Sequence, residues 1–159
     1  MRIYLIGMPG IGKSTLGKVL AKQLNYEFID MDQYIEMQAC MFVDEIFDAY
    51  GEEHFRALER NTLAEFLHID NIVIATGGGI IKNKQNKELL QGLCVYLTAD
   101  LKDISSRLAE SGIVRPLLKD NKLEELYIQR KDLYEYFSDL TVDNTNMDKA
   151  IEKIMEAVQ

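Results

Sequence analysis

Short apolar runs alternate along the chain with longer stretches in which apolar residues recur at helical spacing. Five of the runs have the length and β-branched content of buried strands, and they span residues 3–6, 27–29, 72–75, 93–97 and 140–142. The segments between them show helical spacing, as at Leu16, Val19 and Leu20. Strands that alternate with helices favour a parallel sheet covered by helices on both faces. The pattern therefore predicts an α/β fold.

The end of the chain has the pattern of a final packing helix. Asn146 is a suitable N-cap for a helix that begins at Met147, and Ile151 and Ile154 share its apolar face. Residues 82–87 form a polar run that is typical of a solvated loop and the start of a helix. Neither a repeat nor a linker interrupts the 159 residues, so we expect a single domain over residues 1–159.

The formal net charge is −8, from 18 Lys and Arg residues against 26 Asp and Glu residues. Such a surface repels nucleic-acid phosphates and anionic lipid headgroups, which argues against nucleic acid and membrane as partners. Cys40 and Cys94 lack CxxC spacing, so neither a zinc site nor a disulfide framework is expected. Gly7 and Pro9 interrupt the apolar run near the N-terminus, and no other run is long enough to span a bilayer. These features predict a cytoplasmic protein.

The segment GMPGIGKST, residues 7–15, matches the phosphate-binding pattern G-x-x-x-x-G-K-[ST]. It follows a predicted strand and precedes a helical segment, as this loop (the P-loop) must. Backbone N–H groups in such a loop converge on a phosphate, and the following helix directs its positive end to the same anion. Lys13 can reach the β- and γ-phosphate oxygens, and the Ser14 hydroxyl can ligate Mg²⁺. The predicted ATP-binding residues of the P-loop are Gly10, Ile11, Gly12, Lys13, Ser14 and Thr15.

Two acidic motifs suggest other nucleotide-binding proteins. Residues 48–51 spell the D-x-x-G of GTPase switches, but no N-K-x-D guanine motif accompanies them. Residues 39–45 resemble the strand and acidic residue of motor ATPases, but Phe42, Ile46 and Tyr50 recur at helical spacing. Both segments are therefore predicted to be helical, and neither a GTPase nor a motor ATPase is favoured.

Asp30 and Asp32, which follow the second predicted strand, form a better acidic pair. The carboxyl edge of an α/β sheet is where ligands bind. Alternation along an extended chain would place both side chains on the same side, where one could enter a magnesium shell and the other could face an acceptor hydroxyl. A turn with two solvated aspartates fits the spacing as well.

Four further features are candidates for the acceptor site or a lid. Arg56 and Glu59 are one helical turn apart, a spacing that also suits a surface ion pair. Residues 76–79, TGGG, follow the third strand, where glycines allow a ligand to approach the backbone, although a flexible turn has the same pattern. Arg115 lies in a segment that breaks a helix and is either a lid arginine for the γ-phosphate or a surface residue. Arg130 lies on a later helix.

In this order the motifs GMPGIGKST, DMDQYIE, EIFDAYGEEHFRALE, ATGGG, VRPLL and RKDLY resemble those of the shikimate kinase family. The resemblance covers nearly the whole chain. It implies a three-layer α/β/α fold around a five-stranded parallel sheet, similar to that of nucleoside monophosphate kinases. It also implies an acceptor-binding helical region at about residues 31–60 and a lid at about residues 109–121.

The resemblance assigns a role to each candidate residue. Ser14 and Asp30 would hold one Mg²⁺, and Asp32 would bind the acceptor hydroxyls. The carboxylate of shikimate would be held by Arg56 and Arg130. The other implied residues are Gly77, Gly78 and Gly79 in the acceptor pocket, Arg107 and the loop at residues 143–145 on the adenine side of ATP, and Arg115 in the lid.

The implied reaction is the ATP-dependent phosphorylation of the 3-hydroxyl of shikimate, in aromatic amino acid biosynthesis, by a monomer. Lys13, Arg115 and Mg²⁺ would offset charge on the transferring phosphoryl group, while Asp32 would orient the attacking hydroxyl and could accept its proton. A gluconate-type or nucleoside monophosphate kinase is the nearest alternative, and the arginine pair and the TGGG segment oppose it. A catalytically silent nucleotide-binding regulatory protein is another, opposed by the presence of Asp32 and Arg115.

Overall fold

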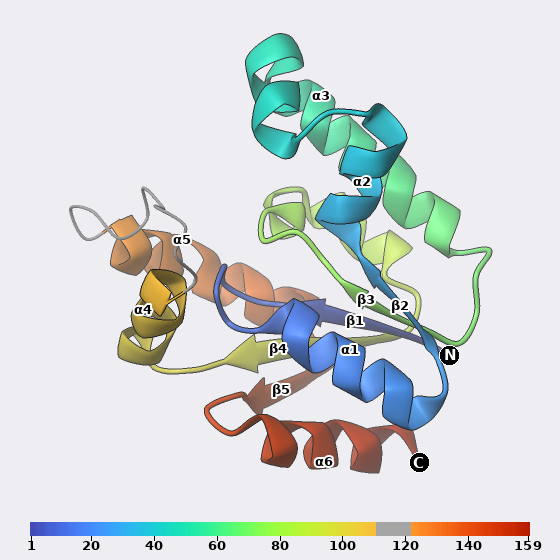
Figure 1. The fold of residues 1–159 in the computed structure, drawn as a ribbon, viewed down its shortest axis with the longest axis vertical. Coiled ribbons are helices and arrows are strands. Elements are labelled where there is room, and N and C mark those ends of the chain that lie inside the picture. Colours follow the sequence, from blue (N-terminus) through green and yellow to red (C-terminus); the bar gives the residue numbers. More distant parts are fainter. Residues whose placement is uncertain (111–121) are drawn as a thin grey trace.

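The computed structural model describes residues 1–110 and 122–159, and its centre is a parallel sheet with the strand order β2-β3-β1-β4-β5. The strands are β1 (Arg2–Ile6), β2 (Glu27–Asp30), β3 (Ile72–Ala75), β4 (Leu93–Thr98) and β5 (Leu140–Asp143). Each strand matches one predicted apolar run to within one residue at either end. The predicted five-stranded parallel sheet is therefore confirmed (Figure 1).

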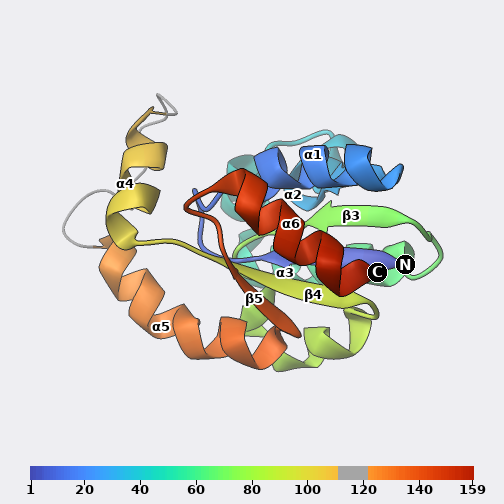
Figure 2. The same cartoon turned by 90° about the horizontal axis from the view of Figure 1, so that it is seen from below.

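Helices form the two outer layers of the fold. The helices are α1 (Lys13–Leu24), α2 (Met31–Ala39), α3 (Val43–Phe66), α4 (Leu101–Glu110), α5 (Lys122–Phe137) and α6 (Met147–Val158), with the 3₁₀ helices η1 (Ile80–Lys82) and η2 (Lys84–Leu89). Helices α1 and α6 lie on one side of the sheet and α5 lies on the other, which confirms the three-layer arrangement (Figure 2). The polar run at residues 82–87 forms 3₁₀ turns rather than the start of an α-helix.

The three inner strands are apolar except for Arg2 and Thr98 at their ends, because both faces of the sheet are covered. Ile3, Leu5, Ile74 and Val95 have no exposed surface, although neighbouring residues of a strand point to opposite faces. The predicted N-cap of the last helix is also confirmed, since the Asn146 side chain accepts a hydrogen bond from the N–H of Lys149.

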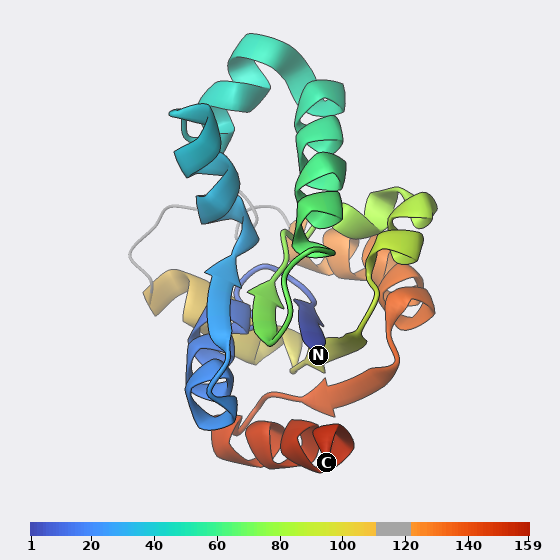
Figure 3. The same ribbon diagram turned by 90° about the vertical axis from the view of Figure 1, so that its right-hand side faces the viewer.

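Helix α2 and the first part of α3 project above the carboxyl edge of the sheet (Figures 1 and 3). The helix α3 is bent at Gly51, whose φ of 86° and ψ of 171° are non-helical. Residues 43–50 and 52–66 are thus two helical pieces joined at a glycine, and the D-x-x-G motif ends at this bend rather than in a GTPase switch. The helical interpretation of the two acidic motifs is confirmed for residues 43–50, but it is wrong for residues 40–42, which connect α2 to α3, and for Gly51.

None of the helices in residues 1–110 and 122–159 combines the length and the apolar character that crossing a bilayer requires. Cys40 is exposed and Cys94 is buried, and neither forms a disulfide. Burial raises the pKa of the Cys94 thiol to about 12, so this cysteine stays protonated and unreactive.

Candidate active site

The carboxyl ends of four strands converge on one cavity of about 670 Å³. The P-loop follows β1, the aspartates follow β2, the TGGG segment follows β3, and α4 follows β4. The cavity is lined by Pro9, Gly10, Gly12, Lys13, Ser14, Thr15, Asp30, Asp32, Thr76, Gly78, Arg107, Leu108 and Glu110. The structure therefore brings the predicted phosphate site and two residues of the predicted acceptor site, Asp32 and Gly78, into contact with the same space.

The P-loop adopts a conformation that depends on glycine. Gly12 is the N-cap of α1 and has a φ of 95°, in the left-handed region where other residues are strained. This turn directs the chain into α1, so that the N–H groups of the first turn face the cavity side of the helix end. The Lys13 ammonium lies over the loop and donates to the carbonyl oxygens of Gly7 at 2.6 Å and Met8 at 3.2 Å.

Ile11 differs from the other predicted ATP-binding residues of the loop. Its side chain is completely buried, it does not line the cavity, and its N–H donates to the carbonyl of Met8. Its carbonyl oxygen accepts hydrogen bonds from Arg107 Nη1 at 2.9 Å and from Asn144 Nδ2 at 2.8 Å. Ile11 thus secures the P-loop against α4 and the loop after β5.

Arg107 occupies the edge of the nucleotide side of the cavity. Besides Ile11, its guanidinium donates to the carbonyl oxygen of Asn144 at 2.7 Å. Asn144 is only 4% exposed. It belongs to residues 143–145, which the family resemblance assigned to the adenine side of ATP. Arg107 and Asn144, which are distant in the sequence, therefore lie together at the nucleotide end of the cavity.

Ser14 and Asp30 form a pair of oxygen ligands beside the P-loop. The Ser14 hydroxyl donates to Asp30 Oδ2 at 2.5 Å, while Asp30 Oδ1 accepts from the N–H of Gln33 and so caps α2. Mg²⁺ prefers oxygen ligands and takes only one or two from the protein, with phosphates and water supplying the rest. One hydroxyl and one carboxylate fit this donor set. No cluster of three or more His, Cys, Asp or Glu residues that could hold a metal by themselves occurs within residues 1–110 and 122–159.

Asp32 lies in the cavity wall, but the expected reason for its position is wrong. The strand β2 ends at Asp30, and Asp32 belongs to the first turn of α2, so period-two alternation does not apply. Asp30 and Asp32 nevertheless line the same cavity because the helix begins directly at its edge. Burial raises the pKa of Asp32 above its usual value, and the negative charge of Asp30 adds to the rise, while Lys13 opposes it. A carboxylate with a raised pKa is a better proton acceptor near neutral pH.

The glycines of the TGGG segment are needed because polar side chains lie against them. None of the three has a positive φ in the left-handed region. A Cβ at Gly77 would lie 2.8 Å from Asp32 Oδ1, and one at Gly79 would lie 2.4 Å from Arg56 Nη1. The sequence predicted close approach of a ligand to this backbone, and the structure shows close approach of the predicted site residues themselves.

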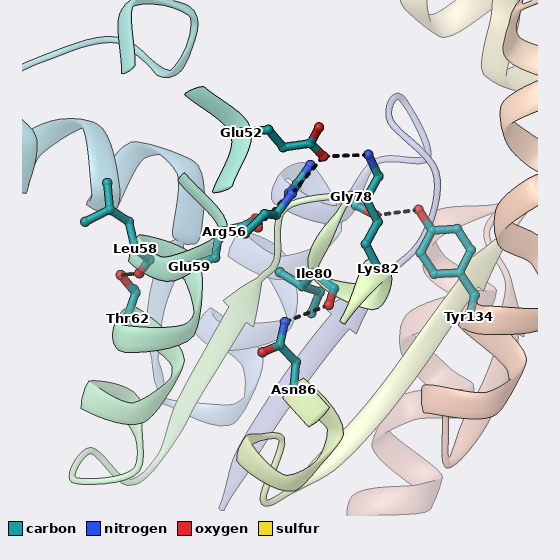
Figure 4. A network of polar contacts seen from close by, with 10 residues as sticks. All are labelled: Glu52, Arg56, Leu58, Glu59, Thr62, Gly78, Ile80, Lys82, Asn86 and Tyr134. Atoms are coloured by element: carbon teal, nitrogen blue, oxygen red, sulfur yellow. Dashed lines mark hydrogen bonds and ion pairs between the residues drawn. The ribbon is translucent and has the colours of Figure 1, made fainter. Parts of the chain in front are cut away.

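Arg56 is held by a buried carboxylate (Figure 4). Its Nη1 lies 2.6 Å from Glu59 Oε1, and the Glu59 side chain is only 1% exposed, so this is not a surface ion pair. Glu52, after the bend of α3, lies 3.5 Å from Arg56 Nε and also pairs with Lys82 at 3.0 Å. Burial raises the pKa of Glu59, although Arg56 opposes this rise with its hydrogen bond and charge.

Arg130 reaches the same turn from the other side, on α5. A Cβ at Gly78 would lie 3.0 Å from Arg130 Nη1. Within the described part of the chain, the buried Nε atoms of Arg56 and Arg130 and the buried Oε2 of Glu59 have no hydrogen-bond partner. Buried polar atoms are rarely left unpaired in proteins, so the two guanidinium groups suit an anionic ligand, whereas the Glu59 oxygen needs a hydrogen-bond donor.

The structure thus gathers nearly every candidate. Arg56, Gly77, Gly79 and Arg130 lie directly behind the cavity wall formed by Gly78 and Asp32, and Arg115 with most of the lid at 109–121 lies outside the described residues. The sequence analysis named Glu59 only as a possible ion-pair partner of Arg56, and it gave no role to Glu110, which lines the cavity. For Glu59 the signal was present, since a charged pair at i and i+3 beside a buried strand can face inward as well as outward.

Comparison with known proteins agrees with this geometry. The family model described as "Shikimate kinase" matches residues 9–159. This chain belongs to the shikimate kinase family. A shikimate kinase of Clostridium botulinum (strain Alaska E43) is 39% identical over 162 residues, which cover 99% of this chain and 96% of that protein. One from Francisella philomiragia is 46% identical over 148 residues, with 89% of this chain and 84% of that protein covered.

Solved shikimate kinases also share the fold. The crystal structure of the Bacteroides thetaiotaomicron enzyme has a TM-score of 0.90 and 31% identity, covering 99% of this chain and 98% of that one. The Acinetobacter baumannii enzyme, solved in complex with shikimate, has a TM-score of 0.88 and 34% identity, covering 99% and 92%. The predicted family, fold and kinase class are therefore confirmed.

Proposed function

We propose that this chain transfers the γ-phosphoryl group of ATP to the 3-hydroxyl of shikimate, giving shikimate 3-phosphate and ADP. The observation that carries the proposal is the single cavity that joins the P-loop to Asp32 and Gly78. A phosphoryl donor and a hydroxyl acceptor must meet in one space for in-line transfer. The complex of the Acinetobacter baumannii relative with shikimate supports the choice of acceptor.

The nucleotide end supplies positive charge and a metal site. Lys13 would turn from the loop carbonyls to the β- and γ-phosphate oxygens, while the first N–H groups of α1 bind the phosphates. Ser14 and Asp30 would share one Mg²⁺ ion, which neutralises phosphate charge when bound. Arg107 would border the adenosine, with Asn144 behind it.

The acceptor end would orient shikimate between one carboxylate and two arginines. Asp32 would bind the attacking hydroxyl and take up its proton, helped by its raised pKa. Arg56 and Arg130 would hold the shikimate carboxylate, because planar guanidinium groups match a carboxylate with paired hydrogen bonds. The Gly77–Gly79 turn gives these groups the room to converge.

The proposal extends to the surroundings of the site. Residues 109–121 would form the lid, with Arg115 stabilising charge during transfer. Residues 31–60 would form the acceptor-binding region.

A monomer is proposed as the working unit because the P-loop, Asp32, Arg56 and Arg130 all come from one chain. The unpaired cysteines suit a reducing cytoplasm, and the net charge of −8 disfavours nucleic acid.

A coupled assay of ADP release tests the activity directly. Shikimate should support turnover, whereas gluconate and nucleoside monophosphates should give rates at least about 100-fold lower, because their anionic group and hydroxyls are spaced differently and cannot reach the arginines and Asp32 together. EDTA should abolish the rate and excess Mg²⁺ should restore it. Comparable rates with gluconate would contradict the assignment of the acceptor.

Substituting Gly79 by Ala should weaken shikimate binding without affecting ATP. The φ of −96° at Gly79 accepts alanine, but the new Cβ would lie within 2.4–2.7 Å of three guanidinium atoms of Arg56. Arg56 would have to move, and we expect the shikimate KM to rise about tenfold or more through loss of charge-assisted hydrogen bonds. The KM of ATP should stay within about twofold. Equal changes in both KM values for Gly79→Ala would show a general loss of structure.

A further inference from the structure

Tyr134 is a buried residue that has no part in the proposed chemistry, and it contacts the glycine turn against which Arg130 lies. The Tyr134 hydroxyl donates to the carbonyl oxygen of Gly78 at 3.0 Å (Figure 4). The Arg130 guanidinium lies against the same glycine, since a Cβ at Gly78 would lie 3.0 Å from Arg130 Nη1, and its charge opposes the rise in the pKa of Tyr134 that burial causes. Tyr134 and Arg130 therefore meet at the Gly78 backbone of the Gly77–Gly79 turn.

The ring of Tyr134 is itself fixed in place. It is 1% exposed and stacks on Tyr96 of β4, with ring centroids 5.1 Å apart and an interplanar angle of 25°. Arg130 and Tyr134 are four residues apart on α5, so they lie on the same face of this helix. The hydroxyl is thus presented to the turn by a rigid part of the core rather than by a mobile side chain.

The contact with Gly78 restrains a part of the chain that has little restraint of its own. Consecutive glycines have no Cβ atoms to limit their dihedral angles, so the peptide between Gly78 and Gly79 can rotate at low cost. A hydrogen bond to the Gly78 carbonyl fixes the plane of that peptide. With this peptide fixed, the backbone against which Arg130 Nη1 lies is also fixed before any ligand arrives.

We propose that Tyr134 is a positioning residue for acceptor binding, which holds Arg130 and the Gly78 peptide in the arrangement that receives the carboxylate of the acceptor. This inference rests on the proposed function, because it takes shikimate as the ligand of Arg130. Tyr134 acts through Arg130 and the Gly77–Gly79 turn, and it touches neither the P-loop nor Asp32. Pre-ordering of this kind improves affinity by lowering the entropy that binding costs.

The test is the variant Tyr134→Phe, which removes one oxygen and keeps the stacked ring. The shikimate KM should rise about tenfold, since the hydrogen bond that fixes the Gly78 peptide beside Arg130 is lost. The KM of ATP should stay within about twofold. Loss of folded protein would lower the apparent kcat and leave the KM of the remaining enzyme unchanged, so the KM values report on positioning alone. Thermal unfolding of the same samples measures the fold directly.

Tyr96→Phe is the matched control, because it removes a hydroxyl from the other ring of the same stacked pair. It should leave both KM values unchanged. In an Arg130→Ala background, Tyr134→Phe should have a much smaller effect on the shikimate KM than in the wild type, because both changes act through one contact. An unchanged shikimate KM in Tyr134→Phe, or an equal rise in Tyr96→Phe, would overturn the positioning role. Absence of turnover in the wild type with shikimate would overturn the proposed function and, with it, this inference. Turnover in the wild type together with an unchanged shikimate KM in Tyr134→Phe would overturn this inference alone.

Discussion

Replacing Asp32 by asparagine is expected to lower kcat at least about 100-fold, because proton acceptance and hydroxyl orientation are lost together. ATP affinity should change by less than about threefold, since Ser14 and Asp30 form the separate site proposed for the metal. Turnover is measured by ADP release, and ATP affinity by titration in the absence of shikimate. A matching loss of ATP affinity would place Asp32 in the magnesium shell instead.

The same substitution should stabilise the ligand-free enzyme. Burial raises the pKa of Asp32 in the folded state, so its charged form is less favourable there than in the unfolded chain. A carboxyl group of this kind favours the fold below its ordinary pKa of 3.8, and that contribution is lost as the pH rises through the raised value. The Tm of Asp32→Asn should therefore exceed that of the wild type by about 2–5 °C at pH 7.

The advantage of Asp32→Asn in Tm should grow as the pH rises from about 4 to 7. Asp44→Asn provides the matched control, because Asp44 also lies in the first turn of a helix, α3, but is exposed. This control should change neither kcat nor the pH dependence of the Tm by a comparable amount. A Tm difference for Asp32→Asn that is independent of pH would show that its charge is not the cause. The active site thus trades some stability for a reactive carboxylate.

The fold could be predicted because its decisive features are local in the sequence. Strands buried on both faces appear as continuous apolar runs, and the P-loop motif sets the turn from β1 into α1 by itself. The helix boundary at Asp30 was harder to predict. Asp30 ends β2 and also caps α2, so the chain turns into a helix one residue earlier than the extended pattern suggested, and Asp32 reaches the cavity from a helix.

The packing of the acceptor wall could not be predicted, because it depends on segments that are distant in the sequence. Glu59 is buried only because α3 lies against the turn after β3, so its i, i+3 pair with Arg56 faces inward. Tyr134 appears in the sequence as one more aromatic residue of a helical segment, and its contact with Gly78 spans 56 residues. The lid role of Arg115 stays a prediction, because this residue lies outside the described part of the chain.

Arg56→Ala should weaken shikimate binding severely and also destabilise the protein. The loss of two charge-assisted hydrogen bonds should raise the shikimate KM about 100-fold. The Glu59 carboxylate would also lose its 2.6 Å partner while it remains 1% exposed. Removing one partner of a buried ion pair costs about 3 kcal/mol, which corresponds to a fall in Tm of roughly 8 °C for a chain of this size.

A second substitution separates these two effects. In Arg56→Ala, only the charge of Arg130 still opposes the rise in the pKa of Glu59 that burial causes. This variant should therefore be least stable well above the ordinary pKa of 4.5 and should recover stability as Glu59 is protonated. Adding Glu59→Gln removes the unpaired charge. The double variant should regain most of the Tm at pH 8 but none of the shikimate affinity, because the guanidinium is still absent.

The shikimate analogue with a carboxamide in place of the carboxylate identifies what Arg56 binds. Wild-type enzyme should use this amide at least about tenfold less efficiently in kcat/KM, and Arg56→Ala should reduce the rate with the amide far less than the rate with shikimate. Arg60→Ala is the matched control, since Arg60 lies one turn further along α3 and donates to Asn86 Oδ1 at 3.2 Å, away from the cavity. It should leave the ratio of the two substrates unchanged. If Arg56→Ala reduced both substrates equally, Arg56 would serve only to neutralise Glu59, and the carboxylate of shikimate would have to be held by Arg130 alone.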